Sequence, residues 1–289
     1  MLEQIILSRE NQRIYGLNVK IKNHWIRHAQ KMSGEVFAAD KTKISTSSIS
    51  PKGAEAAYKL GTTYEGLKDG TKAYTSTSAR TKETVEKILS GYGATNQEAD
   101  IRGEIRARSS LNAGGSPEFI KLYDTKWTEN KKRLLAERGL ALADFSKLSP
   151  DDQQEIAEAA EEPVIREWLD NAGSELAQLQ NPEELASIFA KYFSDKHEMA
   201  KKLKNNSEIE LFNVTHKTAT EPFLASGVLI DSESGKKITK LEQLGGSLGI
   251  LDNWDSEVVN DGEGKATIFV YLRGKKYDVD MVRLKELIS

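Results

Sequence analysis

The stretch that decides the fold is Lys20-Ile-Lys-Asn-His-Trp-Ile-Arg-His-Ala-Gln30. Its apolar part is short, as in a β-strand, and it ends in the polar pair Arg27-His28. A helix is predicted to begin further along at Ser50-Pro51, because serine suits the N-cap and proline the first helical position. These residues therefore predict a strand, a polar turn and a helix.

The same order of elements then repeats. Residues 73–78 predict a strand that runs into hydroxyl-bearing side chains, and Arg80 opens a helix that Gly91 closes. Residues 209–216 predict a further strand, which ends at His216. Alternating strands and helices are typical of a parallel sheet. We therefore predict the α/β class, with a three-layer α/β/α core and a mostly parallel sheet.

The middle of the chain has a different pattern. Residues 117–204 are helical throughout in their pattern and carry 18 acidic and 13 basic residues, a net charge of −5. Pro163 is expected to kink or end one of these helices. We predict a core of residues 1–116 and 205–289, a helical insert (cap) of residues 117–204, and a C-terminal β-hairpin around Arg273-Gly274-Lys275.

Composition excludes several classes of protein. The chain of 289 residues has no cysteine, so disulfides and cysteine nucleophiles are excluded. Its net charge of −3 argues against a nucleic-acid partner. No apolar run approaches the ~20 residues that span a bilayer. Residues 1–10 also lack the pattern of a secretory signal. We expect a cytoplasmic protein with no membrane partner; the sequence leaves its oligomeric state open.

Polar side chains gather where the predicted strands end. Arg27-His28 follows the first strand, Arg80 the second and His216 the third, and ligands of α/β sheets bind outside the carboxyl ends of strands. A histidine can form a covalent phosphoryl intermediate. Arginines hold phosphate oxygens bidentately, and a second histidine can stabilise the transition state. These residue types together indicate phosphoryl chemistry.

Four motifs in this order resemble the histidine phosphatase superfamily, which has the phosphoglycerate mutase-like fold. They are Trp25-Ile-Arg-His-Ala-Gln-Lys31, Ser50-Pro-Lys-Gly53, Ser76-Thr-Ser-Ala-Arg-Thr81 and Val214-Thr-His216. The resemblance covers about two-thirds of the chain and omits the helical insert. It implies that His28 is phosphorylated and that Arg27, Arg80 and His216 bind the phosphoryl group.

The chain departs from the family pattern at two places. Ala29 stands where glycine usually follows the first histidine, and Lys217 stands where the acid-phosphatase branch has an acid. The mutase-like branch takes its proton donor from a glutamate downstream of the second arginine, and Glu104 occupies a comparable place. Glu104 is the first candidate, with Glu35 and Glu221 in reserve.

The function we expect is a phosphomonoester hydrolase that uses no metal or cofactor and acts on a small phosphorylated substrate. A phosphomutase and a catalytically silent binding member are the alternatives. No metal-ligand spacing occurs, and Gly245-Gly-Ser-Leu-Gly249 lacks the lysine of a nucleotide loop, so it is interpreted as a plain loop. His24 and His197 are expected to be structural or exposed.

Overall fold

The computed structural model describes residues 16–30, 48–66, 69–98, 100–101, 103–112, 114–260 and 266–289. Its strands are β1 (Val19–Arg27), β2 (Thr71–Thr75), β3 (Arg106–Ala107), β4 (Glu208–Thr215), β5 (Leu229–Asp231), β6 (Asn253–Asn260), β7 (Ala266–Leu272) and β8 (Lys275–Val279). Its α-helices are α2 (Pro51–Gly61), α3 (Ala79–Thr95), α4 (Pro117–Glu137), α5 (Pro150–Asp170), α6 (Glu175–Leu179), α7 (Pro182–Ala200), α8 (Lys217–Leu224) and α9 (Met281–Ile288). Short 3₁₀ turns lie at η2 (Ser109–Leu111), η3 (Leu142–Lys147) and η4 (Leu241–Leu244).

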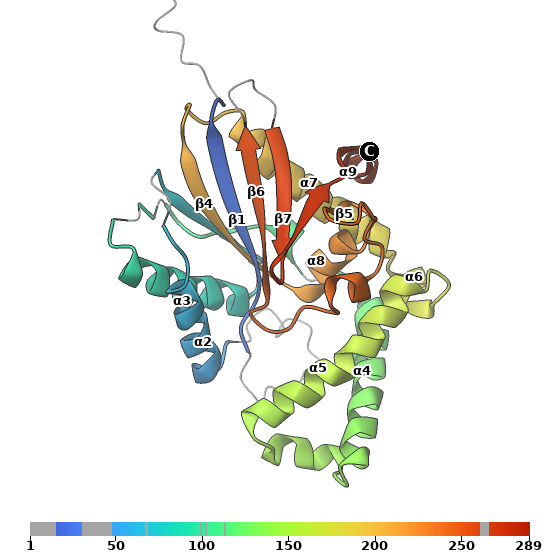
Figure 1. Ribbon diagram of the computed structural model, residues 1–289. Coiled ribbons are helices and arrows are strands. Elements are labelled where there is room, and N and C mark those ends of the chain that lie inside the picture. Colours follow the sequence, from blue (N-terminus) through green and yellow to red (C-terminus); the bar gives the residue numbers. More distant parts are fainter. Residues whose placement is uncertain are drawn as a thin grey trace, which may run out of the picture.

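The strands form one sheet in the order β3-β2-β4-β1-β6-β7-β8-β5 (Figure 1). β3, β2, β4 and β1 pair in parallel, and the remaining pairings are antiparallel. Within the described residues, only β6 and β8 therefore run against the common direction. The predicted α/β class with a mostly parallel sheet is confirmed. The C-terminal hairpin is β7–β8, and its turn residues Arg273 and Gly274 both have positive φ, as a two-residue hairpin turn requires.

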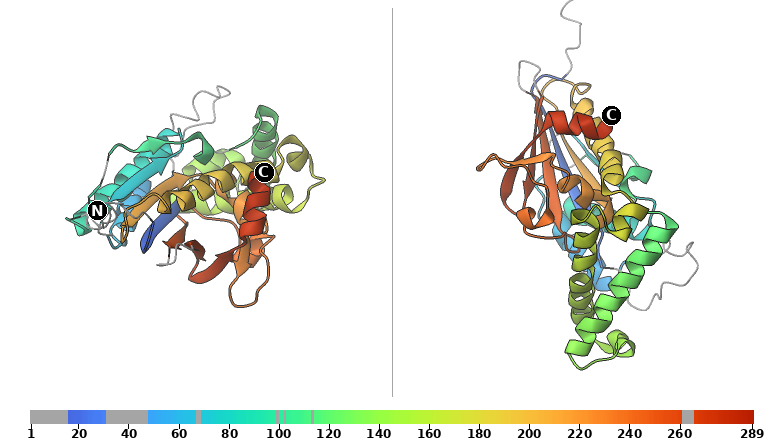
Figure 2. Two further views of the ribbon diagram at one scale, coloured as in Figure 1. Left: turned by 90° about the horizontal axis from the view of Figure 1, so that it is seen from above. Right: turned by 90° about the vertical axis from the view of Figure 1, so that its right-hand side faces the viewer.

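Helices cover both faces of this sheet, which gives the three predicted layers. Ile26 of β1 lies in a cluster with Phe212 and Val214 under α2 and α3. Its neighbour Trp25 points to the other face, where it contacts Phe189 of α7 at 5.0 Å between ring centroids. Successive side chains of a strand alternate between the faces, so a strand covered on both sides must be apolar at nearly every position. Figure 2 shows α7 and α9 side by side on one face of the sheet.

The segment predicted as a helical insert has two parts. α4 and α5 pack on each other and project below the sheet in Figure 1. α7, which ends the same segment, packs on the sheet and belongs to the core layer. Pro163 was expected to kink or end this helix; it lies inside α5, which continues to Asp170, so the helix does not end there. The helix continues because Val164, Ile165 and Trp168, directly after the proline, are buried in the core.

His24 lies at the centre of a buried ionic network. Its Nδ1 is 2.7 Å from an Asp255 carboxylate oxygen of β6, and its Nε2 is 2.7 Å from a Glu210 oxygen of β4. Tyr92 of α3 donates a further hydrogen bond to Glu210 at 2.6 Å. Burial alone would lower the pKa of His24, but the hydrogen bonds and charges of Asp255 and Glu210 outweigh it and raise the pKa. The raised pKa favours the charged form of His24, which connects β1, β4 and β6 and lies away from the edge where β1 ends.

Replacing His24 by Gln leaves the buried Glu210 and the partly buried Asp255 without their cation. We expect the free energy of unfolding at pH 6 to fall by about 3 kcal/mol, as measured by urea denaturation. Because the folded-state pKa of His24 is raised, its stabilisation is complete below the unfolded pKa and is lost as the pH rises through the folded pKa. The difference between wild type and variant is therefore expected to shrink toward pH 9. His197→Gln is the control, since burial lowers the pKa of His197 and no such shrinkage follows. A constant difference for His24→Gln would contradict a charged His24.

Candidate active site

The register of the parallel strands brings the predicted side chains to one edge of the sheet. Arg27 of β1 is opposite Thr215 of β4, and Thr75 of β2 is opposite Val214. The next residues along each strand, His28, Ser76 and His216, therefore meet beyond the same edge. The rings of His28 and His216 lie with their centroids 5.1 Å apart.

His28 is held in one tautomer. Its Nδ1 donates a hydrogen bond of 2.9 Å to the carbonyl oxygen of Ala29, which leaves the lone pair on Nε2. Burial, followed by the charges of Arg80, His216 and Arg27, lowers the pKa of His28 well below its ordinary value. The ring is therefore neutral at physiological pH, and a neutral imidazole is the form that can act as a nucleophile.

The loop after His28 is fixed by the start of α2. Ser50 donates its backbone N–H to the carbonyl oxygen of Gln30 at 2.8 Å. A Cβ on Gly53 would lie 2.6 Å from that same oxygen, so glycine is needed for α2 to approach the loop. Ala29 is fully buried, without a positive φ, and its N–H bonds Thr84 Oγ1 at 3.0 Å. The backbone at Ala29 does not require the glycine of the family pattern.

His216 connects β2, α3 and α8. Its Nε2–H donates to Ser76 Oγ at 3.0 Å, while its Nδ1 accepts from Arg80 Nη2 at 3.2 Å. Burial, then Arg80 and Arg27, lowers the pKa of His216 well below its ordinary value. His216 bonds to Arg80, its ring lies beside that of His28, and the charge of Arg27 lowers its pKa. The structure therefore brings these four predicted residues together. Ser76 opens one of the four motifs, but the sequence did not predict that it orients a histidine.

Arg27 is anchored by the helical insert and by the glycine-containing loop. Its Nη1 donates to Leu248 O at 2.7 Å, and its Nη2 lies 3.2 Å from Glu161 Oε2 of α5. The same Glu161 oxygen accepts from Lys217 Nζ at 2.8 Å, and the other accepts from the Tyr123 hydroxyl at 2.9 Å. Burial alone would raise the pKa of Glu161, but Arg27 and Lys217 lower it to about 2. Glu161 is an ionised carboxylate that the sequence interpretation missed.

The three candidate proton donors lie in different surroundings. Glu104 is exposed and comes two residues before Arg106, which pairs with Tyr74, so it lies short of the edge where the histidines meet. No hydrogen bond or ion pair connects it to them in the part of the chain that is described. Glu35 lies outside the described residues. Glu221 is fully buried in α8, one helical turn after Lys217.

Glu221 is connected to Arg27 through a single residue. Its Oε1 accepts from Leu248 N and from Ser247 Oγ, both at 2.6 Å, and the Leu248 carbonyl accepts from Arg27. Oε2 of Glu221 has no hydrogen-bond partner among the described residues. Burial raises the pKa of Glu221 to about 7 against the opposing effect of Lys217. The carboxyl is therefore protonated in part of the molecules at neutral pH. Loop 245–249 was predicted to be a loop without a role in binding, but its Leu248 positions both Arg27 and Glu221.

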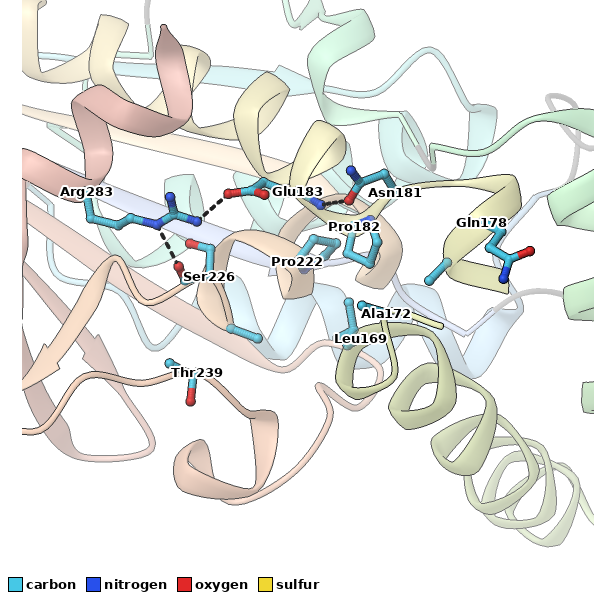
Figure 3. Close-up of a pocket in the computed structure, with 12 residues that line it drawn as sticks. Leu169, Ala172, Gln178, Asn181, Pro182, Glu183, Pro222, Ser226, Thr239 and Arg283 are labelled. Carbon is cyan, nitrogen blue, oxygen red and sulfur yellow. Dashed lines mark hydrogen bonds and ion pairs between the residues drawn. The ribbon is translucent and has the colours of Figure 1, made fainter. Parts of the chain in front are cut away.

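A pocket of about 530 Å³ lies at the C-terminal end of α8, and its lining includes none of the predicted site residues (Figure 3). Its lining includes Leu169, Pro222 and Thr239. Glu183 and Arg283 also line it and form an ion pair, with Arg283 Nη2 2.5 Å from Glu183 Oε1. Arg283 also donates to the carbonyl oxygen of Ser226 at 3.0 Å. The guanidinium is thus engaged by Glu183 of α7 and by the Ser226 carbonyl, two residues after α8. The pocket lies where residues of α5, α7 and α9 meet.

The described residues show two further features. No group of three or more His, Asp or Glu side chains in them is arranged to hold a metal ion. None of their helices combines the length and the apolar character needed to cross a bilayer.

The sequence matches no family model and no curated protein, but solved structures are similar. Phosphoglycerate mutase from Bacillus anthracis str. Sterne is 20% identical, with 94% of this chain and 98% of that chain covered and a TM-score of 0.41. Phosphoserine phosphatase from Entamoeba histolytica is 11% identical, with 91% and 99% covered and a TM-score of 0.43. Hafnia alvei phytase is 10% identical, with 88% and 84% covered and a TM-score of 0.45.

These three proteins are members of the histidine phosphatase superfamily, which the motifs of this sequence resemble. With identities of 20% or less and TM-scores below 0.5, the matches assign no activity to this chain. Any proposal of function depends on the geometry of the site.

Replacing Glu161 by Gln is expected to lower the free energy of unfolding at pH 7 by about 3 kcal/mol, because two buried cations lose their carboxylate. The folded-state pKa of Glu161 is lowered, so its contribution is present above pH 4.5 and is lost as the pH falls toward 2. Urea denaturation of the wild type and the variant between pH 7 and 3 measures this. Glu162→Gln changes the neighbouring carboxylate, which pairs with Arg166 on the surface, and serves as the control. Equal losses for both variants would contradict the anchoring role.

Proposed function

We propose that this chain is a metal-independent phosphomonoesterase of the histidine phosphatase superfamily that acts through a phosphohistidine on His28. The observation that carries the proposal is the state of His28. Its Nδ1 proton is committed to the Ala29 carbonyl, and its charge is suppressed by burial and two arginines. A neutral ring whose Nε2 lone pair lies among cationic groups suits attack on an anionic phosphate ester.

In the proposed reaction, Nε2 of His28 attacks phosphorus and the bond between phosphorus and the ester oxygen breaks. Arg27, Arg80 and His216 stabilise the charge on the non-bridging oxygens. Arg27 Nε is buried without a hydrogen-bond partner among the described residues, which leaves one donor of its guanidinium for a ligand. Water then attacks the phosphohistidine, the N–P bond breaks, and phosphate leaves with His28 restored.

Glu221 is the proton donor that we propose for the departing alcohol, in preference to Glu104. A general acid must be protonated at the working pH and must lie close to the reacting groups. Glu221 is buried next to the Leu248 anchor of Arg27 and has a free Oε2, whereas Glu104 is exposed and apart from the histidines. Glu221 loses its proton to the leaving oxygen and is reprotonated when water is activated.

His28→Ala is expected to lower kcat/KM for 4-nitrophenyl phosphate at least 10³-fold in the presence of EDTA. The reason is that no other group among the described residues occupies the nucleophile's position. His197→Ala, which changes a buried histidine of α7, is expected to retain activity. Phosphoenzyme trapped with ³²P-labelled substrate is expected in the wild type and absent from His28→Ala. Unchanged hydrolysis by His28→Ala would contradict the proposal. Transfer of phosphoryl to substrate rather than water would indicate a mutase, and phosphate binding without turnover a binding protein.

Glu221→Gln separates the two candidate acids through the leaving group. An alkyl phosphate needs protonation of its leaving oxygen, so we expect at least a 100-fold loss of kcat. 4-Nitrophenolate leaves without much assistance, so its rate is expected to change little. Because the pKa of Glu221 is about 7, the wild-type rate with the alkyl ester is expected to fall as the pH rises above 7. Glu104→Gln is the matched variant; if it shows the selective loss instead, Glu104 is the acid.

A further inference from the structure

Four basic residues gather at the β3 edge of the sheet, outside the histidine site. Lys72 lies on β2 two residues before Tyr74, and Tyr74 pairs with Arg106 of β3. Residues two apart on a strand point to the same face, so Lys72 shares the face of Tyr74, and Arg108 shares that of Arg106. Lys196 of α7 covers this face. We call Lys72, Arg106, Arg108 and Lys196 the basic cluster.

Lys196 is the buried member of the basic cluster. Its residue is only 6% exposed, and Nζ lies 3.5 Å from the ring centroid of Tyr74 and 4.5 Å from that of Tyr192. The Tyr192 hydroxyl is already engaged, since it donates to Asn213 at 2.9 Å. Among the described residues, Lys196 forms no hydrogen bond and no ion pair with a carboxylate.

The surroundings of Lys196 are strongly cationic. Burial, followed by the charges of Arg108, Lys72 and Arg106, lowers its pKa to about 7, against the opposing charge of the exposed Asp195. Arg108 lies over the same Tyr74 ring, with Cζ 5.7 Å from the centroid. Like charges held this close repel one another, and a buried cation without a counter-charge is costly. An anion between these groups would remove both penalties.

We propose that the basic cluster is a second anion-binding site, which takes the phosphate-type oxyanion of a small ligand. Arg106 and Arg108 are exposed and free to turn their planar guanidinium groups to the anion, which they can bind bidentately. Lys196 provides a point charge, and the rings of Tyr74 and Tyr192 hold it in place. The anion is either free or part of a larger phosphorylated molecule, because both present the same oxygens.

The second site adjoins the histidine site without sharing side chains with it. The backbone N–H of Arg108 donates to Thr75 O at 2.7 Å, one residue before Ser76. The Arg108 side chain, however, turns back over Tyr74, whereas Ser76 bonds to His216. The two sites can therefore be changed independently.

The test is calorimetric titration of inorganic pyrophosphate into full-length Arg80→Ala protein, in which the histidine site is weakened. We expect pyrophosphate to bind this protein and its affinity to fall at least tenfold when Arg106→Ala and Arg108→Ala are added. Lys236→Ala with Lys285→Ala removes the same charge from exposed positions elsewhere and is expected to leave the affinity unchanged. Unchanged binding after the Arg106/Arg108 substitutions, or an equal loss in the control, would overturn the proposal. Free phosphate and a phosphorylated nucleoside, titrated in parallel, distinguish a free anion from a larger ligand.

A second measurement examines Lys196 itself. Part of the Lys196 population is neutral at pH 7.5, so anion binding is expected to take up protons, seen as a binding enthalpy that depends on the buffer's ionisation enthalpy. Lys196→Met keeps the apolar stem over Tyr74 and Tyr192 and is expected to abolish the Lys196 share of this uptake and to lower the affinity. Asp195→Asn removes the single opposing acid and is expected to raise the affinity about twofold. Equal proton uptake by the wild type and Lys196→Met would contradict a role for Lys196 in the site.

Discussion

The parallel register of β1, β4 and β2 is the constraint on which the histidine site depends. Because Arg27 is opposite Thr215 and Thr75 is opposite Val214, the residues that follow these strands must emerge at one edge. A shift of one residue in the β1–β4 pairing would turn His28 away from His216 and would also exchange Trp25 and Ile26 between the two faces. The buried His24, bonded to β4 and β6, resists such a shift. The packing of both faces and the geometry of the site therefore depend on the same register.

Assembling this site concentrates positive charge, and the helical insert balances it. Arg27 and Lys217 are both buried, and both are bonded to Glu161 of α5. Lys217 stands where the resemblance leads one to expect an acid, and Glu161 supplies a carboxylate to the same neighbourhood from 56 residues away. Leu248 connects this arrangement to Glu221, because its carbonyl oxygen accepts from Arg27 and its backbone N–H donates to Glu221. The insert is thus joined to the charge balance of the site as well as to its shape.

Much of the fold was predictable from short patterns, and much of the site was not. Strand ends, the helix cap at Ser50 and the Arg273-Gly274 turn are local signals, and the structure contains all of them. β6 was missed, although its inward positions alternate regularly along the strand. The contacts of Glu161 and Glu221 depend on loops and helices distant in sequence, so no local pattern predicts them. Burial distinguishes Glu221, the proton donor that we propose, from Glu104, and residue type alone does not reveal it.

Two buried lysines of this chain show how differently a cation can be accommodated. Lys217 has a carboxylate at 2.8 Å, so its charge is balanced within the protein and serves to hold Arg27 in place. Lys196 has two tyrosine rings and three basic neighbours, and the resulting environment brings its pKa to about 7. A cation–π contact offsets only part of the cost of burying an ammonium group. The protein interior therefore supplies a counter-charge to Lys217, whereas Lys196 has no carboxylate partner among the described residues. For this reason we regard Lys217 as structural and propose that Lys196 binds an anion.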